Sequence, residues 1–147
     1  MTPSSHAPPA GQLLDTQTHA HLKLSLQQDS QAAQLFARFA RIAEIEGFPD
    51  EARTFREIAE SQAFQAQGHL DLLMRAGDPL SGSSMGGTTQ NLRAALSAHE
   101  ELLDPLPDMV RAARAEGFFD VASWYETLLH ARQAHRQRLR GLLDGEV

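Results

Sequence analysis

An internal repeat constrains the fold of this chain more than any other feature. Shifting the 147-residue sequence by 70 residues, without a gap, superposes much of it on itself. The motif Glu-Gly-Phe at 46–48 falls on Glu-Gly-Phe at 116–118, and Asp50 falls on Asp120. Amphipathic helices of Ala and Leu share apolar spacing by chance, but they do not share a polar turn. We therefore interpret the two halves as copies of one supersecondary unit.

Each half of the repeat predicts two helices joined by a short turn. Apolar residues recur at three- and four-residue steps, as on one face of a helix, and Gly47 and Gly117 end the first helix of each pair. Pro105 and Pro107 should kink or interrupt the third helix because proline lacks a backbone N–H. The predicted helices run over about 16–46, 51–76, 90–116 and 121–143, with Asp15, Asp50 and Asp120 as N-caps of the first, second and fourth.

A segment poor in helix-forming residues separates the two hairpins at 77–89. Two short-linked hairpins with one long connection predict an all-α, ferritin-like four-helix bundle, because an up-down-up-down bundle would need no long central link. We expect a flexible tail at 1–14 and one bundle domain at 15–147. The repeats cover about 16–76 and 86–146, and the crossover covers 77–89.

Composition excludes several classes of function. The net charge of −6 argues against a generic nucleic-acid binder, and no apolar run approaches the roughly 20 residues of a membrane span. The absence of cysteine excludes disulfides, thiolate metal sites and cysteine nucleophiles within this chain. The first residues lack the layout of a signal peptide, so we expect a cytoplasmic protein by default.

Polar residues interrupt the apolar stripes at matching places in both halves. The 70-residue shift puts Asp29 on His99. A polar group in the middle of a bundle loses free energy unless it is paired, so these residues should meet one another. The predicted polar core cluster is Asp29, Gln62, Gln65, His99, Arg132 and His135.

The chain resembles rubrerythrin from about residue 20 onward. The likeness is carried by Asp-Ser-Gln-Ala at 29–32, Ala-x-x-Glu-Gly-Phe at 43–48 and 113–118, and Asn-Leu-Arg-Ala-Ala-Leu at 91–96. The resemblance implies a ferritin-like bundle in which each half supplies a Glu and a Glu-x-x-His to two irons. It also implies peroxide-reducing oxidoreductase activity, often with a rubredoxin domain as electron donor. That domain needs cysteines, which this chain lacks.

Carried over position by position, the resemblance implies a ligand set that is largely replaced. Asp29 stands for the first Glu, and His135 is retained. The second-helix Glu-x-x-His reads Gln62-Ala-Phe-Gln65, and the fourth-helix motif reads Arg132-Gln-Ala-His135. His99 and Leu102 stand at the remaining two Glu positions.

This ligand set lacks the charge that a di-iron centre requires. Two irons need several carboxylates, whereas the set has one, together with a guanidinium that cannot bind a metal. We therefore expect no cofactor and a metal-free polar network, in which Arg132 pairs with Asp29. A second reading is one Fe or Zn ion held by Asp29, His99 and His135, with Glu100 or Glu101 as a further ligand. A third is a small anionic or polar ligand held by Arg132.

Two classes of function follow from these readings. One is a non-catalytic protein with a binding or structural role, and it has no catalytic residues. The other is a metal-binding oxidoreductase with altered ligands. The resemblance implies a homodimer, and neither a nucleic acid nor a membrane is an expected partner.

Overall fold

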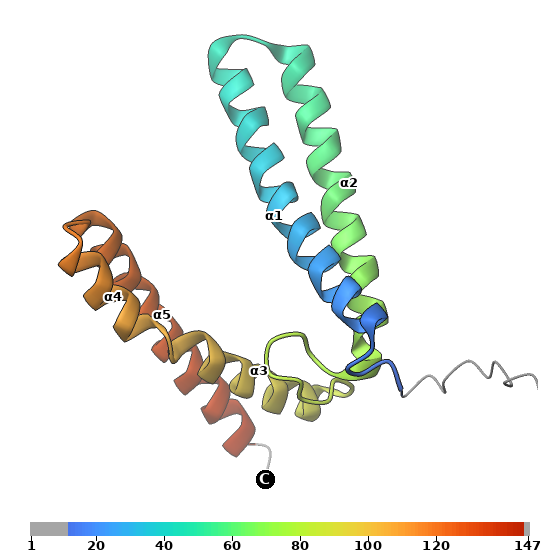
Figure 1. The fold of residues 1–147 in the computed structure, drawn as a ribbon, viewed down its shortest axis with the longest axis vertical. Coiled ribbons are helices and arrows are strands. Elements are labelled where there is room, and N and C mark those ends of the chain that lie inside the picture. The colour runs from blue at the N-terminus through green and yellow to red at the C-terminus, as the bar shows by residue number, and fades with distance from the viewer. Residues whose placement is uncertain (1–11, 146–147) are drawn as a thin grey trace, which may run out of the picture. The chain divides into compact units, whose positions relative to one another are not determined.

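The computed structural model describes residues 12–145, and the described part contains α-helices, one short 3₁₀-helix and no β-strand. The helices are α1 (Gln17–Glu46), α2 (Pro49–Leu73), α3 (Thr88–Leu103), α4 (Leu106–Ala115) and α5 (Phe119–Asp144), and the 3₁₀-helix Met74–Ala76 extends α2. The chain divides into two compact units between Ala76 and Gly77. In the first unit α1 packs along α2, and in the second α3 and α4 both pack along α5 (Figure 1). The expected all-α class and its two helical hairpins are confirmed.

The two hairpin turns have the same hydrogen bonds. Gly47 and Gly117 have φ values of 84° and 85°, in the left-handed region that glycine adopts most readily. The N–H of Phe48 donates to the carbonyl of Ala43 at 2.8 Å, and the N–H of Phe118 donates to that of Ala113 at 2.8 Å. Each turn is therefore a Schellman motif, which satisfies the last carbonyls of one helix before the next begins.

An ion pair across each hairpin repeats with its charges exchanged. Arg56 on α2 pairs with Glu44 on α1, and Arg114 on α4 pairs with Glu126 on α5. The 70-residue shift places Glu44 on Arg114 and Arg56 on Glu126. The same pairing therefore holds in both units, although the identity of each partner has changed.

The contact between α1 and α2 is built from small residues. Ala52, Ala59, Ala66 and Leu73 follow one another at seven-residue steps on α2, and all are buried. On α1 the buried residues are Ala40 and Ala43. A repeat of seven keeps one face of a helix toward its neighbour. Alanine methyl groups fill this seam along most of its length and Leu73 closes its far end, so several larger apolar side chains near the turn, such as Ile42 and Phe48, lie at its sides.

The predicted third helix is interrupted at its prolines. α3 ends at Leu103 and α4 begins at Leu106, with Pro105 as its N-cap and Pro107 in its first turn. Neither proline can donate to the helical ladder, which is the physical reason for the break. The prediction of an interruption between Gln90 and Glu116 is confirmed.

The predicted N-caps are wrong. Thr16 caps α1, and its side chain accepts a hydrogen bond from the N–H of His19. Asp15 instead has a φ of 61°. Asp50 and Asp120 lie in the first turns of α2 and α5, which begin at Pro49 and Phe119. There they face the positive end of the helix dipole without capping it.

The connection between the units is shorter than expected and carries its own hydrogen bonds. It covers 77–87, since α3 begins at Thr88. The Asp78 carboxylate accepts hydrogen bonds from the N–H groups of Leu80, Ser81 and Ser83 and from the Ser81 hydroxyl. Gly77 has a φ of 90°, and a Cβ there would lie 2.4 Å from the Gly82 carbonyl oxygen. This backbone therefore requires glycine at 77.

Most of the expected tail at 1–14 lies outside the described residues. The end of the expected second repeat, at 146, also lies outside them. No helix among residues 12–145 is long and apolar enough to cross a membrane.

Candidate functional site

A half-buried polar contact between α1 and α2 joins Asp29 to His69. The Nε2 atom of His69 lies 2.6 Å from Oδ2 of Asp29. The side chain of Asp29 is 22% exposed and that of His69 is 27% exposed, so the contact is largely shielded from water. The residues meet because they lie at similar distances from the turn of an antiparallel hairpin. The carboxylate at the first ligand position thus has a partner within its own hairpin.

The two glutamines on α2 are not part of that contact. Gln62 is half-buried, and its Oε1 atom is buried without a hydrogen-bond partner among the described residues. Gln65 is exposed and donates from Nε2 to the Ser61 hydroxyl at 3.4 Å. Both amides are neutral, so neither adds negative charge next to Asp29.

Two imidazoles approach each other between α3 and α5. The rings of His99 and His135 have centroids 5.7 Å apart and stand nearly perpendicular, at 79°. His99 is half-buried, whereas His135 is exposed within its unit. The Nδ1 atom of His99 lies 3.1 Å from the Ala95 carbonyl oxygen. A carbonyl only accepts, so this contact assigns the ring proton to Nδ1 and leaves Nε2 as the free acceptor of a neutral ring.

The arginines of α5 are oriented by α3. Arg132 is half-buried and donates from Nη1 to the Leu102 carbonyl oxygen at 2.9 Å. Arg136 and Arg140 both reach the Glu100 carboxylate, at 3.4 and 3.8 Å. Glu100, considered above as a further metal ligand, therefore lies between two cations in this unit.

The expected pair between Arg132 and Asp29 involves two different units and stays a prediction. Within its own unit, each of these side chains has a different partner. Sequence reasoning placed His69 on the stripe of α2, one turn beyond Gln65, but did not pair it with Asp29. Counting equally outward from Gly47 would not have paired them, because Asp29 lies 18 residues before that glycine and the residue 18 after it is Gln65. His69 lies 22 residues after Gly47, about one helical turn further along α2.

The comparisons with known proteins cover most of the chain. The rubrerythrin family profile matches residues 21–143. The chain belongs to the rubrerythrin family. It is also 30% identical over 141 residues to a protein named rubrerythrin from Porphyromonas gingivalis, an alignment that covers 90% of this chain and 70% of that one. This membership confirms the resemblance and supports the ferritin-like four-helix class.

The residues at the rubrerythrin ligand positions do not fit a di-iron centre. Within each unit taken by itself, the described residues include no group of three His, Asp or Glu side chains that could hold a metal. The contact between Asp29 and His69 is too short to enclose an ion. Two donors bound to one ion at about 2.0–2.2 Å would lie about 3 Å or more apart, whereas these atoms lie 2.6 Å apart, as in a hydrogen bond.

Proposed function

We propose that this rubrerythrin-family protein has lost the di-iron centre and has a non-catalytic binding or structural role. A metal-free polar cluster takes the place of the metal, and its members are Asp29, Gln62, Gln65, His99, Arg132 and His135. The observation that supports this proposal most strongly is the hydrogen bond from His69 to Asp29. It gives the one carboxylate of the set a partner other than a metal ion.

The charges of the cluster also favour a hydrogen-bonded network over two irons. Arg132 stands where the resemblance implies a Glu, so a metal ligand with one negative charge is replaced by a permanent cation. A guanidinium offers five donors and no acceptor, and it would repel a metal ion nearby. Carbonyls, carboxylates and neutral imidazoles are the partners that satisfy it, as the bond to the Leu102 carbonyl illustrates.

A second candidate is a metal-binding oxidoreductase that would use one Fe ion at the altered site, peroxide or oxygen as substrate and an external electron donor. One Zn ion is the alternative occupant of the same site, but zinc does not change oxidation state and would not support that reaction. It is favoured by the approach of the His99 and His135 rings, which gives two imidazoles on neighbouring helices. Asp29 would have to leave His69 and become the third ligand. Two histidines and a carboxylate form a suitable set for either ion.

Metal loading separates the two candidates. The full chain is incubated with Fe(II) or Zn(II), desalted, and examined for bound metal and for its melting temperature. The proposal predicts no stoichiometric metal and no change in melting temperature. The second candidate predicts one ion per chain, bound by the wild type and by a His130→Ala control, and lost from a His99→Ala, His135→Ala double variant.

The proposal also covers the oligomeric state and the cellular location of the protein. The protein acts in the cytoplasm as a homodimer, without a nucleic-acid or membrane partner. Light scattering on the purified chain measures the mass directly. A mass of one chain at micromolar concentration would exclude the dimer.

A further inference from the structure

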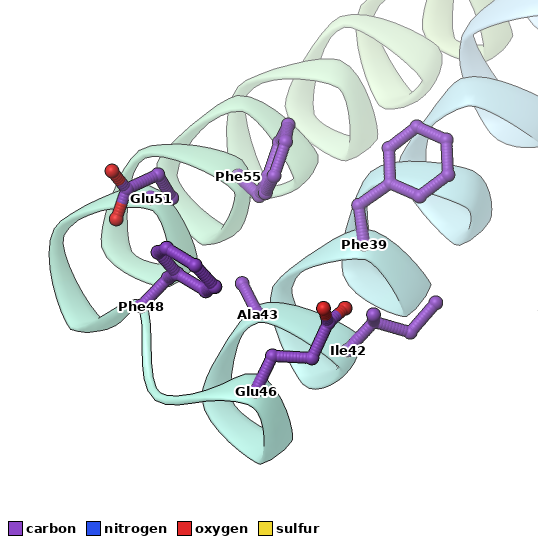
Figure 2. A pocket seen from close by; sticks show the side chains of 7 residues that line it. All are labelled: Phe39, Ile42, Ala43, Glu46, Phe48, Glu51 and Phe55. Carbon is purple, nitrogen blue, oxygen red and sulfur yellow. The ribbon is translucent and has the colours of Figure 1, made fainter.

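A hollow of about 410 Å³ lies at the end of the first hairpin, where α1 turns into α2. Figure 2 shows that its walls come from both helices and from the turn between them. The rings of Phe39 and Phe55 lie 5.5 Å apart between centroids and form one side. The side chains that line it and matter here are Phe39, Ile42, Glu46, Phe48, Glu51 and Phe55.

The alanine seam is the physical reason why these apolar side chains lie outside the contact between α1 and α2. Ala43 and Ala52 fill the space between the helices and are 7% and 2% exposed. The bulkier Ile42 and Phe48 stay outside it and are 43% and 52% exposed. Covering these apolar side chains would be favourable, because it removes apolar surface from water.

Carboxylates at the hollow give it a negative charge. Glu46 ends α1 and Glu51 lies in the first turn of α2. Neither forms an ion pair with a described residue, whereas their neighbours Glu44 and Asp50 pair with arginines. An occupant that carries a cation beside an apolar group would satisfy both features of the hollow.

The repeat shows that the turn itself does not require these residues. At the positions of Ile42 and Glu51 the second hairpin has Ala112 and Val121. It nevertheless forms the same Schellman turn at Gly117. The bulk at position 42 and the charge at position 51 are therefore additions of the first hairpin to a turn that is stable without them.

We propose that this hollow is a docking site for a basic amphipathic helix of a partner protein. An apolar side chain of that helix enters between Phe39, Phe48 and Phe55. Its lysines or arginines reach Glu46 and Glu51. A small molecule fits less well, because bound small ligands are mostly enclosed, whereas Phe39, Ile42 and Phe48 are 36–52% exposed. An amphipathic helix covers such an open groove with several anchors at once.

The proposal goes beyond the loss of the di-iron centre and does not depend on it. Peptide binding can be measured whether or not a metal is present, so either proposal can fail while the other stands. If the docking proposal holds, this hollow is the surface through which the protein carries out the binding role proposed above.

The test is fluorescence anisotropy with the full chain and a labelled helical peptide of leucine and lysine. The control peptide has the same leucine pattern with glutamate in place of lysine. The Ile42→Ala, Glu51→Val double variant installs the residues of the second hairpin, so its fold should be kept. We expect at least tenfold weaker binding by this variant, weaker binding in high salt, and no binding of the glutamate peptide.

A matched pair of single variants tests the charge alone. Glu46→Gln should weaken binding severalfold, and Glu116→Gln, its counterpart in the second hairpin, should leave binding unchanged. Equal binding by the wild type and the double variant would overturn the proposal, as would equal binding of both peptides. A wild-type dimer that dissociates in the double variant would also overturn it, because the occupant would then be a second copy of this chain.

Discussion

His69 on α2 and Asp29 on α1 form a hydrogen bond of 2.6 Å between side chains 40 residues apart in the sequence. The bond joins the middle of α1 to the last part of α2, and the rubrerythrin resemblance implies a metal-bound carboxylate at the position of Asp29. Both side chains are mostly shielded from water. Asp29, which stands at a metal-ligand position of the family, is thus hydrogen-bonded to another side chain of the protein.

Removing this contact should destabilise the protein. We expect His69→Ala to lower the free energy of unfolding by about 1–2 kcal/mol, because a largely buried carboxylate loses its partner. Urea denaturation of the single variants and of the His69→Ala, Asp29→Ala double variant measures the coupling between the two side chains. A coupling energy near zero would show that the contact contributes nothing to stability.

The requirement for glycine in the first hairpin turn can be tested by substitution. Gly47→Ala should destabilise the protein by about 1 kcal/mol, because alanine at a positive φ is strained. The cost comes from the backbone alone, since a Cβ at Gly47 would meet no atom within 4 Å. Gly68, inside α2, is the control. A Cβ there is equally unhindered, and Gly68→Ala should stabilise by about 0.5–1 kcal/mol. If thermal denaturation gives both variants the same sign, the turn assignment is wrong.

The stability that Asp78 contributes through the segment 77–87 should decrease at acid pH. Burial alone would raise the pKa of Asp78, but hydrogen bonds from the Ser81 hydroxyl and from backbone N–H groups, including that of Ser83, outweigh it. The pKa of Asp78 therefore lies below its usual value of 3.8. A lowered pKa in the folded state means that the ionised carboxylate stabilises the fold at neutral pH. This contribution is lost as the pH falls below about 4 and through the folded pKa.

Asp78→Asn should accordingly be less stable than the wild type at pH 7, and the difference should shrink at pH 3. Thermal denaturation at both pH values measures it, with the exposed Asp71→Asn as a control for the general loss of charge. A difference that is the same at both pH values would contradict the role of the ionised carboxylate.

Restoring the ligands tests the assignment of the old metal positions. The restored variant combines Asp29→Glu, Gln62→Glu, Gln65→His, His99→Glu, Leu102→Glu and Arg132→Glu. We expect it to bind close to two irons per chain, because each half then supplies the Glu and Glu-x-x-His of the family. The matched control has the same changes but keeps Arg132, and its iron content should be lower. Equal iron in the two variants would mean that the guanidinium does not exclude the metal.

Local features made most of the fold predictable from sequence. The repeat and the apolar spacing predicted the hairpins, and Pro105 and Pro107 predicted the break between α3 and α4. The caps were less predictable, because each is displaced by one or two residues: Thr16 follows Asp15, and Phe48 and Phe118 precede Asp50 and Asp120 by two. Thr16 competes with Asp15 through its own hydroxyl, and Pro49 begins α2 one residue before Asp50.

The helices that carry the candidate site residues were predictable, whereas the contacts of those residues were less so, and their gathering into one cluster stays a prediction. The stripes placed Asp29 and His99 correctly on their helices. Charge alone favoured Arg132 as a partner of Asp29, and that pair between the two units stays a prediction. The sequence did not indicate His69, which the register of the first hairpin brings to Asp29. That register is set by the turn at Gly47 and the alanine seam, which act together over 40 residues and leave no local signal at either side chain.

The central claim is that this family member binds no metal at its ligand positions. Elemental analysis of the full chain, purified from cells grown with added iron and zinc, tests it most directly. The account predicts only trace metal, equal in the wild type and in the His99→Ala, His135→Ala variant. One or two ions per chain in the wild type, lost from that variant and kept by His130→Ala, would contradict it.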